Sequence, residues 1–339
     1  MLVVKPRTDF EPVHALLMES LSAKAVMSAV ELKMFDYLEG REVEVSELAD
    51  EMKLIPERLE PVLDILVAAD LLVKNGGGYG NAPVASEFLV SHAPLYQGDS
   101  MALTMRFNAT VEDSIATMLA GGEGDRAGTD EGWGMAEIME GTAQDAKGGA
   151  LSHVVDFVTE LPGFDGFRSM CDIGGNHGMY TIGVLERNSG MNGVIYDLPH
   201  VVEQTGLRCE ELGFSDRVTT QAMDFKEGRL PAETYDLALT SHVLYAFEDD
   251  LNGALKRIAE GLKPGGWFVS HHYAGRNREG RELTKASLEL LTRLCGYHSH
   301  FIEQEELTVA LESAGFGDIR FQPVSSGGLG LMTAARKLA

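Results

Sequence analysis

Apolar residues in the first hundred positions recur at the spacing of amphipathic helices. Over residues 12–39 they cover more than one helical face, which is typical of a helix buried by a second chain as well as by its own domain. Ser46 is a candidate N-cap, Pro56 suits the first turn of the next helix, and the glycines at 76–78 predict a hairpin turn. Helices followed by a hairpin predict a mainly α-helical, winged-helix-like domain over residues 1–100.

Residues 101–160 also have mostly helical periodicity, interrupted by GGEGDRAGTDEG at 121–132, which predicts a loop between helices that cap a cleft. This stretch is expected to connect the two domains. Methionine and aromatic side chains in it fit either an ordinary core or the wall of a pocket for a flat apolar ligand. They are Met101, Met105, Phe107, Met118, Trp133, Met135 and Met139.

From residue 161 to residue 339 the pattern changes to short apolar strands that alternate with helical stretches. The strands are expected at 170–173, 193–196, 218–221, 235–239, 267–270 and 318–321. Such alternation predicts an α/β domain with a doubly wound, mostly parallel, Rossmann-like sheet. Ligands of these sheets bind outside the carboxyl ends of the strands, so candidate chemistry is sought there.

The charge restricts the partners. The 28 Lys and Arg against 52 Asp and Glu leave a net charge of −24, which disfavours nucleic acid and anionic membranes. Residues 1–100 hold eight basic and seventeen acidic side chains, so dimerisation is favoured over DNA binding for the first domain. Three scattered cysteines, no signal-peptide pattern and no run of about 18 apolar residues predict a cytoplasmic protein without a membrane span. The apolar helices of residues 12–39 predict a homodimer.

The first strand of the alternating region ends in Cys171-Asp172-Ile173-Gly174-Gly175-Asn176-His177-Gly178. Gly174, Gly175 and Gly178 permit a tight turn and close approach of a ligand to a helix N-terminus. In a dinucleotide site a carboxylate at Asp172 would repel the pyrophosphate. A carboxylate there suits a nucleoside that carries an ammonium and a sulfonium instead, as S-adenosylmethionine does.

Two further acidic residues follow the next two strands. Asp197, followed by Leu198, comes about 20 residues after the glycine loop, where a carboxylate accepts hydrogen bonds from ribose hydroxyls. Asp224 can accept from an adenine amino group while Phe225 covers the ring. Carboxylates at three successive strand ends predict one nucleoside site.

Taken in order, DIGGNHG, YDLPHVV, MDF, SHVLYAFEDD and LKPGGWFV resemble the small-molecule O-methyltransferases, which include caffeate and hydroxyindole enzymes. The resemblance extends over nearly the whole chain. It implies a class I methyltransferase domain behind a dimerisation domain, S-adenosylmethionine as cofactor, and a small, aromatic or heteroaromatic acceptor whose oxygen is methylated.

The sequence departs from this family after the fourth strand. Tyr245 stands where the family carries its general-base histidine, Ser241 replaces a lysine at the cofactor, and Phe247 replaces a tryptophan beside adenine. A phenol, with a reference pKa near 10, is a weak base at neutral pH. Orientation alone can accelerate methyl transfer. Alternatively, the acceptor is an activated carbon, as for a chlorin C-methyltransferase of the family that also carries tyrosine here.

A third explanation assigns proton transfer to another histidine. His271 and His272 follow the fifth strand, His298 and His300 lie in CGYHSHF, and His242 precedes Tyr245 by three residues. We take Tyr245, His271, His272 and His298 as the catalytic candidates. No metal-spacing motif such as His-Glu-x-x-His is present, so no metal is expected. A cofactor-binding relative without catalysis and, more distantly, a nicotinamide dehydrogenase are the alternatives.

Overall fold

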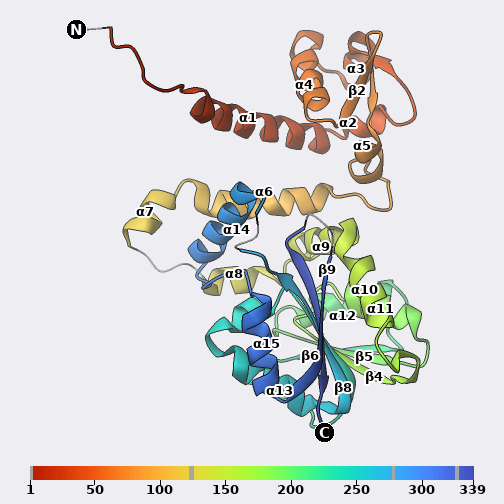
Figure 1. The fold of residues 1–339 in the computed structure, drawn as a ribbon. Coiled ribbons are helices and arrows are strands. Elements are labelled where there is room, and N and C mark those ends of the chain that lie inside the picture. The colour runs from red at the N-terminus through yellow and green to blue at the C-terminus, as the bar shows by residue number, and fades with distance from the viewer. Residues whose placement is uncertain (1–2, 122–125, 277–278, 325–327) are drawn as a thin grey trace. The chain divides into compact units, whose positions relative to one another are not determined.

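The computed structural model describes residues 3–121, 126–276, 279–324 and 328–339 (Figure 1). The chain divides into two compact units, Met1–Ala102 and Leu103–Ala339. Helix α6 (Gly98–Glu112) runs across this boundary. The two units are described separately below.

The first unit consists of short helices and one small sheet. Its elements are α1 (Glu11–Glu31), α2 (Met34–Tyr37), β1 (Val43–Glu44), α3 (Val45–Met52), α4 (Pro56–Ala68), β2 (Leu72–Asn75), β3 (Gly78–Asn81) and α5 (Pro83–Phe88). The antiparallel sheet has the order β1-β3-β2, and the expected helix pair and hairpin are α3, α4 and β2–β3. Phe35, Leu48, Leu63, Leu66 and Tyr79 are fully buried in its core.

Helix α1 exposes a long apolar face. Within it only Met27, Ala29 and Val30 are buried, while Val13, Leu16, Leu17, Met18 and Leu21 face solvent. An 18-residue window of this 21-residue helix has a mean hydropathy of 1.2, with 11% of the window buried, so by length and composition alone it could cross a membrane. The sequence analysis expected no such segment.

The second unit begins with helices and continues as a seven-stranded sheet with helices between the strands. The helices are α7 (Ile115–Ala120), α8 (Arg126–Gly132), α9 (Ala136–Asp145), the π-helical η1 (Ala146–Ala150), α10 (Leu151–Thr159), η2 (Phe164–Gly166), α11 (Met179–Arg187), α12 (Val202–Glu211), η3 (Leu244–Asp250), α13 (Leu251–Gly261), α14 (Glu282–Leu294) and α15 (Gln304–Ser313). The strands are β4 (Ser169–Ile173), β5 (Asn192–Asp197), β6 (Val218–Ala222), β7 (Tyr235–Ser241), β8 (Leu262–Tyr273), β9 (Phe316–Pro323) and β10 (Gly330–Lys337).

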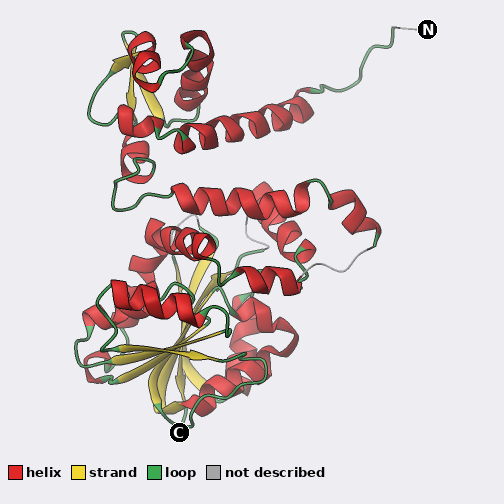
Figure 2. Ribbon diagram, turned by 180° about the vertical axis from the view of Figure 1, so that it is seen from behind, coloured by secondary structure: helices red, strands yellow, loops and turns green. Residues whose placement is uncertain are grey.

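The sheet has the order β6-β5-β4-β7-β8-β10-β9. All neighbouring pairs from β6 to β8 are parallel, and β10 is antiparallel to both β8 and β9. Helices cover both faces (Figure 2), which explains why the strands read as nearly continuous apolar runs. The doubly wound, mostly parallel Rossmann-like fold is thereby confirmed.

Successive side chains along each strand point to opposite faces of the sheet and so enter two different hydrophobic cores. On β8, Trp267 and Val269 enter the core that includes α10 and α11, whereas Phe268 enters the core that includes α13 and α15. Leu237 and Ala238 on the adjacent β7 divide in the same way. The central strands are therefore clamped on both faces, and their carboxyl ends are held in fixed positions.

Three details differ from the sequence expectation. Residues 126–132 of the expected loop form α8, while residues 122–125 lie outside the described residues. Strand β8 is longer than expected at both ends, and β10 was not anticipated. The segment GLMTAARK in β10 gives no clear strand pattern because both of its faces are buried in the sheet.

Candidate active site

A cavity of about 320 Å³ opens at the carboxyl ends of the parallel strands. The loop after β4, the end of β5 and the segments after β6 and β7 form one side of it, and residues around α8–α9, with Tyr297 and His300, form the other. Among the sequence candidates, it is lined by Asp172, Gly174, Gly175, Asp197, Leu198, Asp224, Phe225, Ser241 and Tyr245. The three acidic strand ends therefore meet in one site.

Close packing explains the glycines of the loop after β4. Gly174 has φ +68°, and a Cβ there would lie 2.5 Å from Val243 Cγ2. A Cβ on Gly175 would lie 2.8 Å from Asp172 Cγ. Gly178 caps α11 and does not line the cavity. The loop thus leaves its backbone open to a ligand at Gly174 and Gly175, whereas Gly178 lies behind the cavity wall at the start of α11.

Asp172 is buried at the end of β4, with 1% of its surface exposed. Thr181 Oγ1 donates a 2.8 Å hydrogen bond to Oδ2, whereas Oδ1 has no protein partner among the described residues. Burial raises the pKa of Asp172 to about 7, and the nearby Asp197 charge acts in the same direction. A buried carboxylate with one unpartnered oxygen is prepared for a cationic ligand group.

Asp197 joins the ends of two adjacent strands. Its Oδ2 accepts a 2.9 Å hydrogen bond from the Asn176 amide in the glycine loop, and Oδ1 accepts one of 2.7 Å from the Leu198 amide. Burial raises the pKa of Asp197 although these two bonds oppose the shift. Because each carboxylate oxygen can accept a second hydrogen bond, the side chain can still receive two hydroxyls.

Asp224 and Phe225 follow β6. Asp224 is exposed toward the cavity mouth and accepts a 2.9 Å hydrogen bond from the Lys226 amide. Phe225 is buried and packs edge-to-face with Phe247, with ring centroids 5.7 Å apart. Both phenylalanines line the cavity, so this part provides an apolar slot beside a carboxylate.

Three of the four catalytic candidates do not line the cavity. His271 and His272 are buried on opposite faces of β8, where their Nδ1 atoms bond Ser241 Oγ and Ser270 Oγ, both at 3.0 Å. The His298 side chain is 70% exposed and pairs with Glu248 at 3.0 Å. The structure therefore corrects the expectation that one of these three histidines faces the acceptor.

Tyr245 does line the cavity and is surrounded by aromatic rings. It stacks on His300, with centroids 4.3 Å apart and an interplanar angle of 26°, and meets Tyr297 edge-on at 5.0 Å. His242 and Tyr273 complete the group, 4.4 Å apart, and both line the cavity as His300 does. A phenol and an imidazole thus stack on each other in the cavity wall.

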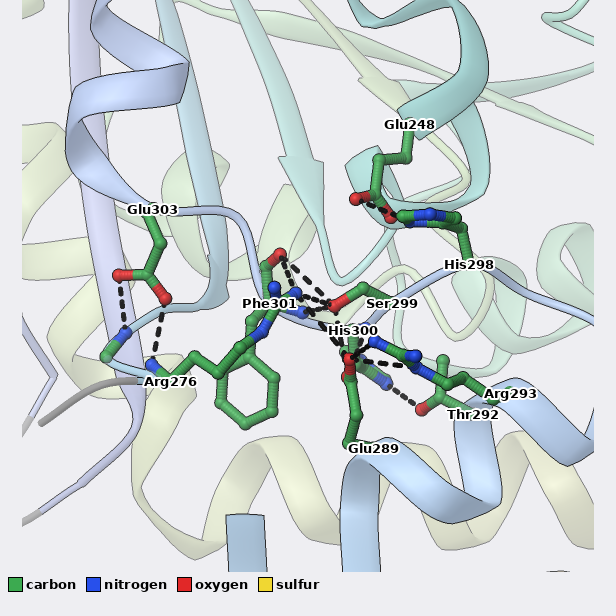
Figure 3. A network of polar contacts seen from close by, with 11 residues as sticks. Glu248, Arg276, Glu289, Thr292, Arg293, His298, Ser299, His300, Phe301 and Glu303 are labelled. Carbon is green, nitrogen blue, oxygen red and sulfur yellow. Dashed lines mark hydrogen bonds and ion pairs between the residues drawn. The ribbon is translucent and has the colours of Figure 1, made fainter. Parts of the chain in front are cut away.

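His300 belongs to a loop that Glu289 of α14 holds in place (Figure 3). Glu289 accepts hydrogen bonds from Arg293 Nη2 at 2.6 Å, Ser299 Oγ at 3.0 Å and the His300 amide at 3.3 Å. Burial acts to raise the pKa of Glu289, but the bonds from Arg293, Ser299 and His300 outweigh it and the pKa is lowered. Arg276 adds an ion pair at 3.6 Å and bonds Ser299.

His300 and His242 line the cavity but are not among the four residues selected from the sequence. Which of the two histidines in CGYHSHF turns inward depends on how the loop after α14 folds back, and no local pattern reports this. Asn176 of the glycine loop is a further cavity residue, whose Nδ2 donates a hydrogen bond to the Trp133 carbonyl oxygen at 3.0 Å. No group of three or more metal-ligating side chains is found within the described ranges.

A second cavity of about 500 Å³ lies among α6, α8 and α14. Phe107, Met118 and Met135 line it, and Trp133 of the first cavity contacts Phe107 with centroids 5.8 Å apart. Met139 is buried, and Met101 packs on the core of the first unit. The methionine and aromatic set therefore divides between a cavity wall and ordinary packing.

Comparison with known families identifies the two parts of the chain. Residues 145–320 match the methyltransferase domain family, and residues 15–91 match the O-methyltransferase dimerisation domain. The chain belongs to the S-adenosylmethionine-dependent O-methyltransferase family. It is a methyltransferase, and the resemblance read from the sequence is confirmed.

Two curated relatives and one solved structure illustrate this family. The chain is 30% identical to the N,N-dimethyltransferase OxyT of Streptomyces rimosus, over 73% of each chain. It is 26% identical to 3-hydroxy-5-methyl-1-naphthoate 3-O-methyltransferase of Streptomyces sahachiroi, over 93% of this chain and 91% of that one. The fold matches human N-acetylserotonin methyltransferase with a TM-score of 0.76 at 22% identity, covering 99% of this chain and 100% of that one.

The raised pKa of Asp172 predicts a pH-dependent stability of the ligand-free protein. The folded state keeps this proton to a higher pH than the unfolded chain, so the contribution of Asp172 to the free energy of unfolding falls as the pH rises from about 4 to about 7. Asp172→Asn removes the ionisation, and its melting temperature is expected to gain several degrees on the wild type across this window.

Thermal melts of both proteins between about pH 4 and pH 8 measure this difference in melting temperature. Groups that titrate alike in the two proteins do not contribute to the difference. Asp216→Asn, on the exposed surface, controls for the change in net charge. A difference between Asp172→Asn and wild type that stays constant with pH would contradict the prediction.

Proposed function

We propose that this enzyme methylates a hydroxyl group of a small aromatic or heteroaromatic acceptor and binds S-adenosylmethionine through its three acidic strand ends. The observation that carries the proposal is the meeting of Asp172, Asp197 and Asp224 in one cavity behind a glycine loop. When bound, S-adenosylmethionine supplies a methyl group on a positively charged sulfur. Every other requirement, namely binding, alignment and exclusion of water, falls to the protein.

The residues present fit the cofactor. The unpartnered Oδ1 of Asp172 suits the α-ammonium group, and the open backbone at Gly174 and Gly175 lets the amino-acid end approach. Asp197 keeps hydrogen-bonding capacity for both ribose hydroxyls. Asp224 can accept from the adenine amino group, with Phe225 and Phe247 beside the ring.

The resemblance implies a lysine in contact with the cofactor at position 241, and Ser241 does not fit that role well. Its hydroxyl bonds His271 Nδ1 at 3.0 Å, although the residue lines the cavity. A serine is too short to replace a lysine as a charged contact. We therefore assign Ser241 to the wall of the cofactor pocket, where its hydroxyl holds His271 in place.

The aromatic acceptor is supported by the rings that line the far side of the cavity. These are Trp133, Tyr245, Tyr273, Tyr297 and His300. Flat rings stack favourably on one another, and such walls exclude water from the reacting atoms. The naphthoate specified in the name of the Streptomyces sahachiroi relative is a flat aromatic acceptor of the same kind.

A second candidate is methylation of an amine. It is favoured by the match to an N,N-dimethyltransferase and by Tyr245 at the position of the family's base histidine, since a neutral amine attacks without prior loss of a proton. Methylation of an activated carbon remains a further chemical alternative for the same reason.

We also propose that the chain forms a homodimer through the apolar face of α1. The dimerisation-domain match spans most of this helix, and the leucines at positions 16, 17 and 21 are between 52% and 62% exposed. A second copy would remove this surface from water, which also accounts for its membrane-like hydropathy in a chain of net charge −24. We also propose that the protein is cytoplasmic, because its three scattered cysteines are free thiols and suggest no disulfide framework.

Cofactor binding can be tested without knowing the acceptor. S-adenosylhomocysteine is expected to raise the melting temperature of the wild type, and Asp197→Ala is expected to abolish the shift because it removes the acceptor for both ribose hydroxyls. Asp216→Ala, which removes an exposed carboxylate away from the cavity, should keep the shift. Calorimetry that detects no binding to the wild type would overturn the cofactor site.

The acceptor class is tested with labelled S-adenosylmethionine and a panel of naphthols, hydroxynaphthoates, hydroxyindoles, anilines and aliphatic amines. Transfer to a ring hydroxyl is expected, with the carbon NMR shift of the transferred methyl group distinguishing an O-methyl from an N-methyl or C-methyl product. Transfer to amines alone would support the second candidate. Tight binding of S-adenosylhomocysteine with no transfer to any acceptor would leave a cofactor-binding relative without catalysis.

The dimer is tested by light scattering during size-exclusion chromatography. The wild type is expected at twice the 36.8 kDa of the chain, and the double variant Leu17→Glu/Leu21→Glu at the monomer mass because two charges cannot be buried in an apolar interface. Val309→Glu, which adds a charge at an exposed position of α15, should remain dimeric. A monomeric wild type would refute the dimer, and wild type found only with membranes would point to a lipid partner for α1.

A further inference from the structure

The replacement of the family's base by Tyr245 leaves open where the acceptor proton goes. The proton acceptor must line the cavity, have a free lone pair and lie next to the place that Tyr245 occupies. Three histidines among the described residues line the cavity, His177, His242 and His300. His177 belongs to the glycine loop, where its ring packs against Tyr180 and its Nδ1 accepts a hydrogen bond from the Met179 amide. The candidates on the side of Tyr245 are therefore His242 and His300. Each also carries one buried ring nitrogen without a protein partner among the described residues, His242 Nδ1 and His300 Nε2.

His300 meets the positional requirement better. Its ring stacks directly on Tyr245 at 4.3 Å, so it is in van der Waals contact with the residue at the base position. His242 lies 5.8 Å from His300 and is packed against His271 and Tyr273, with centroid distances of 4.3 and 4.4 Å. Its ring therefore contacts three other rings, those of His271, Tyr273 and His300.

We propose that His300 Nε2 is the general base of this enzyme and that Tyr245 serves as the surface on which its ring is held. This inference rests on the proposed O-methylation. In the step, the acceptor oxygen forms a bond to the methyl carbon while the bond from that carbon to sulfur breaks and leaves its electron pair on sulfur. The oxygen–hydrogen bond breaks, and the proton goes to Nε2.

One hydrogen bond orients the His300 ring, and the proposal requires that Nδ1 be its donor. Nδ1 lies 3.1 Å from Thr292 Oγ1, a buried hydroxyl of α14. When Nδ1 carries the hydrogen and donates it to Thr292, the lone pair is on Nε2. Burial lowers the pKa of His300 to about 4, with the Glu289 charge opposing the shift, so the ring is neutral at neutral pH.

The loop that carries His300 is fixed from the opposite side. The Glu289 carboxylate accepts hydrogen bonds from the His300 amide and the Ser299 hydroxyl. It also forms ion pairs with Arg276 and Arg293 (Figure 3). In the same view His298 reaches Glu248 on another element, so neighbouring histidines of one loop have different environments. This divergence supplies a matched control within the loop.

The decisive experiment compares His300→Gln with His298→Gln, using as acceptor the naphthol or hydroxynaphthoate that the panel identifies. His300→Gln is expected to lose at least about 100-fold in kcat, the lower range for a general base, with unchanged affinity for S-adenosylhomocysteine by calorimetry. His298→Gln, whose side chain is exposed and pairs with Glu248 outside the cavity, is expected to stay within a few-fold of wild type.

Removing a general base lowers activity by an amount that depends on whether the acceptor still carries its proton, whereas removing a structural residue does not. With a nitro-substituted naphthol that is already ionised at neutral pH, the defect of His300→Gln should shrink to a few-fold because no proton remains to be removed. Added imidazole should partly restore His300→Ala toward the un-ionised naphthol. An equal loss with both acceptors and no rescue would overturn the proposal.

Nitrogen NMR of the histidine rings gives a readout independent of turnover. The signal that disappears in His300→Gln should show a hydrogen on Nδ1 and none on Nε2, a pattern that Thr292→Ser keeps and Thr292→Val loses. A wild-type ring with the hydrogen on Nε2 would refute the assignment. So would a large loss in His242→Asn, whose side chain tolerates the φ of +51° at that position, with normal activity in His300→Gln.

The outcomes separate this inference from the proposed function. If the wild type binds S-adenosylhomocysteine and methylates a naphthol while His300→Gln does so equally well, only the assignment of His300 fails. If the wild type transfers no methyl group to any hydroxyl, O-methylation itself fails and the base assignment fails with it.

Discussion

The carboxylate of Asp197 holds the site together. It stands at the end of β5 and binds backbone amides on two segments, Asn176 in the loop after β4 and Leu198 in its own turn. A carboxylate that accepts hydrogen bonds from backbone N–H groups makes strong, charge-assisted contacts. These bonds determine the spacing between the glycine loop and the next strand end. The width of the nucleoside slot follows from this spacing, and so does the approach to the buried Asp172.

Burial then gives each polar group of the cavity a defined chemical state. Asp172 loses hydration, so its pKa rises to about 7 and it can change charge when a cation approaches. The imidazoles respond in the opposite direction. Desolvation lowers the pKa of His271 and His300 to about 4, so both rings are neutral and can accept protons or hydrogen bonds. One physical cause thus raises the pKa of the carboxyl group and lowers the pKa of the two imidazoles.

Two segments that are far apart in sequence meet at one aromatic pair in the cavity wall. Tyr245, in the segment after β7, stacks on His300, which lies in the loop after α14. The hydrogen bond from the His300 amide to Glu289 anchors that loop. The shape of this wall therefore depends on a contact outside the cavity.

The first unit obeys a separate constraint. Its own core is complete around Phe35, Leu63 and Tyr79, yet α1 leaves most of its apolar residues outside that core. A helix that is apolar over more than one face can be buried only by something beyond its own domain. Composition and hydropathy alone do not distinguish a lipid from a second copy, and the family match favours the copy.

The sequence by itself determined the fold class and the cofactor end of the site. Strand–helix alternation and carboxylates at successive strand ends are local patterns, and the topology of a parallel sheet forces their tips together. Tertiary structure alone decided which histidine enters the cavity, because His298 and His300 have similar local sequence and differ only in what the loop packs against. The same holds for β10, whose segment lacks an alternating pattern, and for α8. Periodicity reports which faces are buried, whereas the return path of a loop depends on contacts between residues distant in the chain.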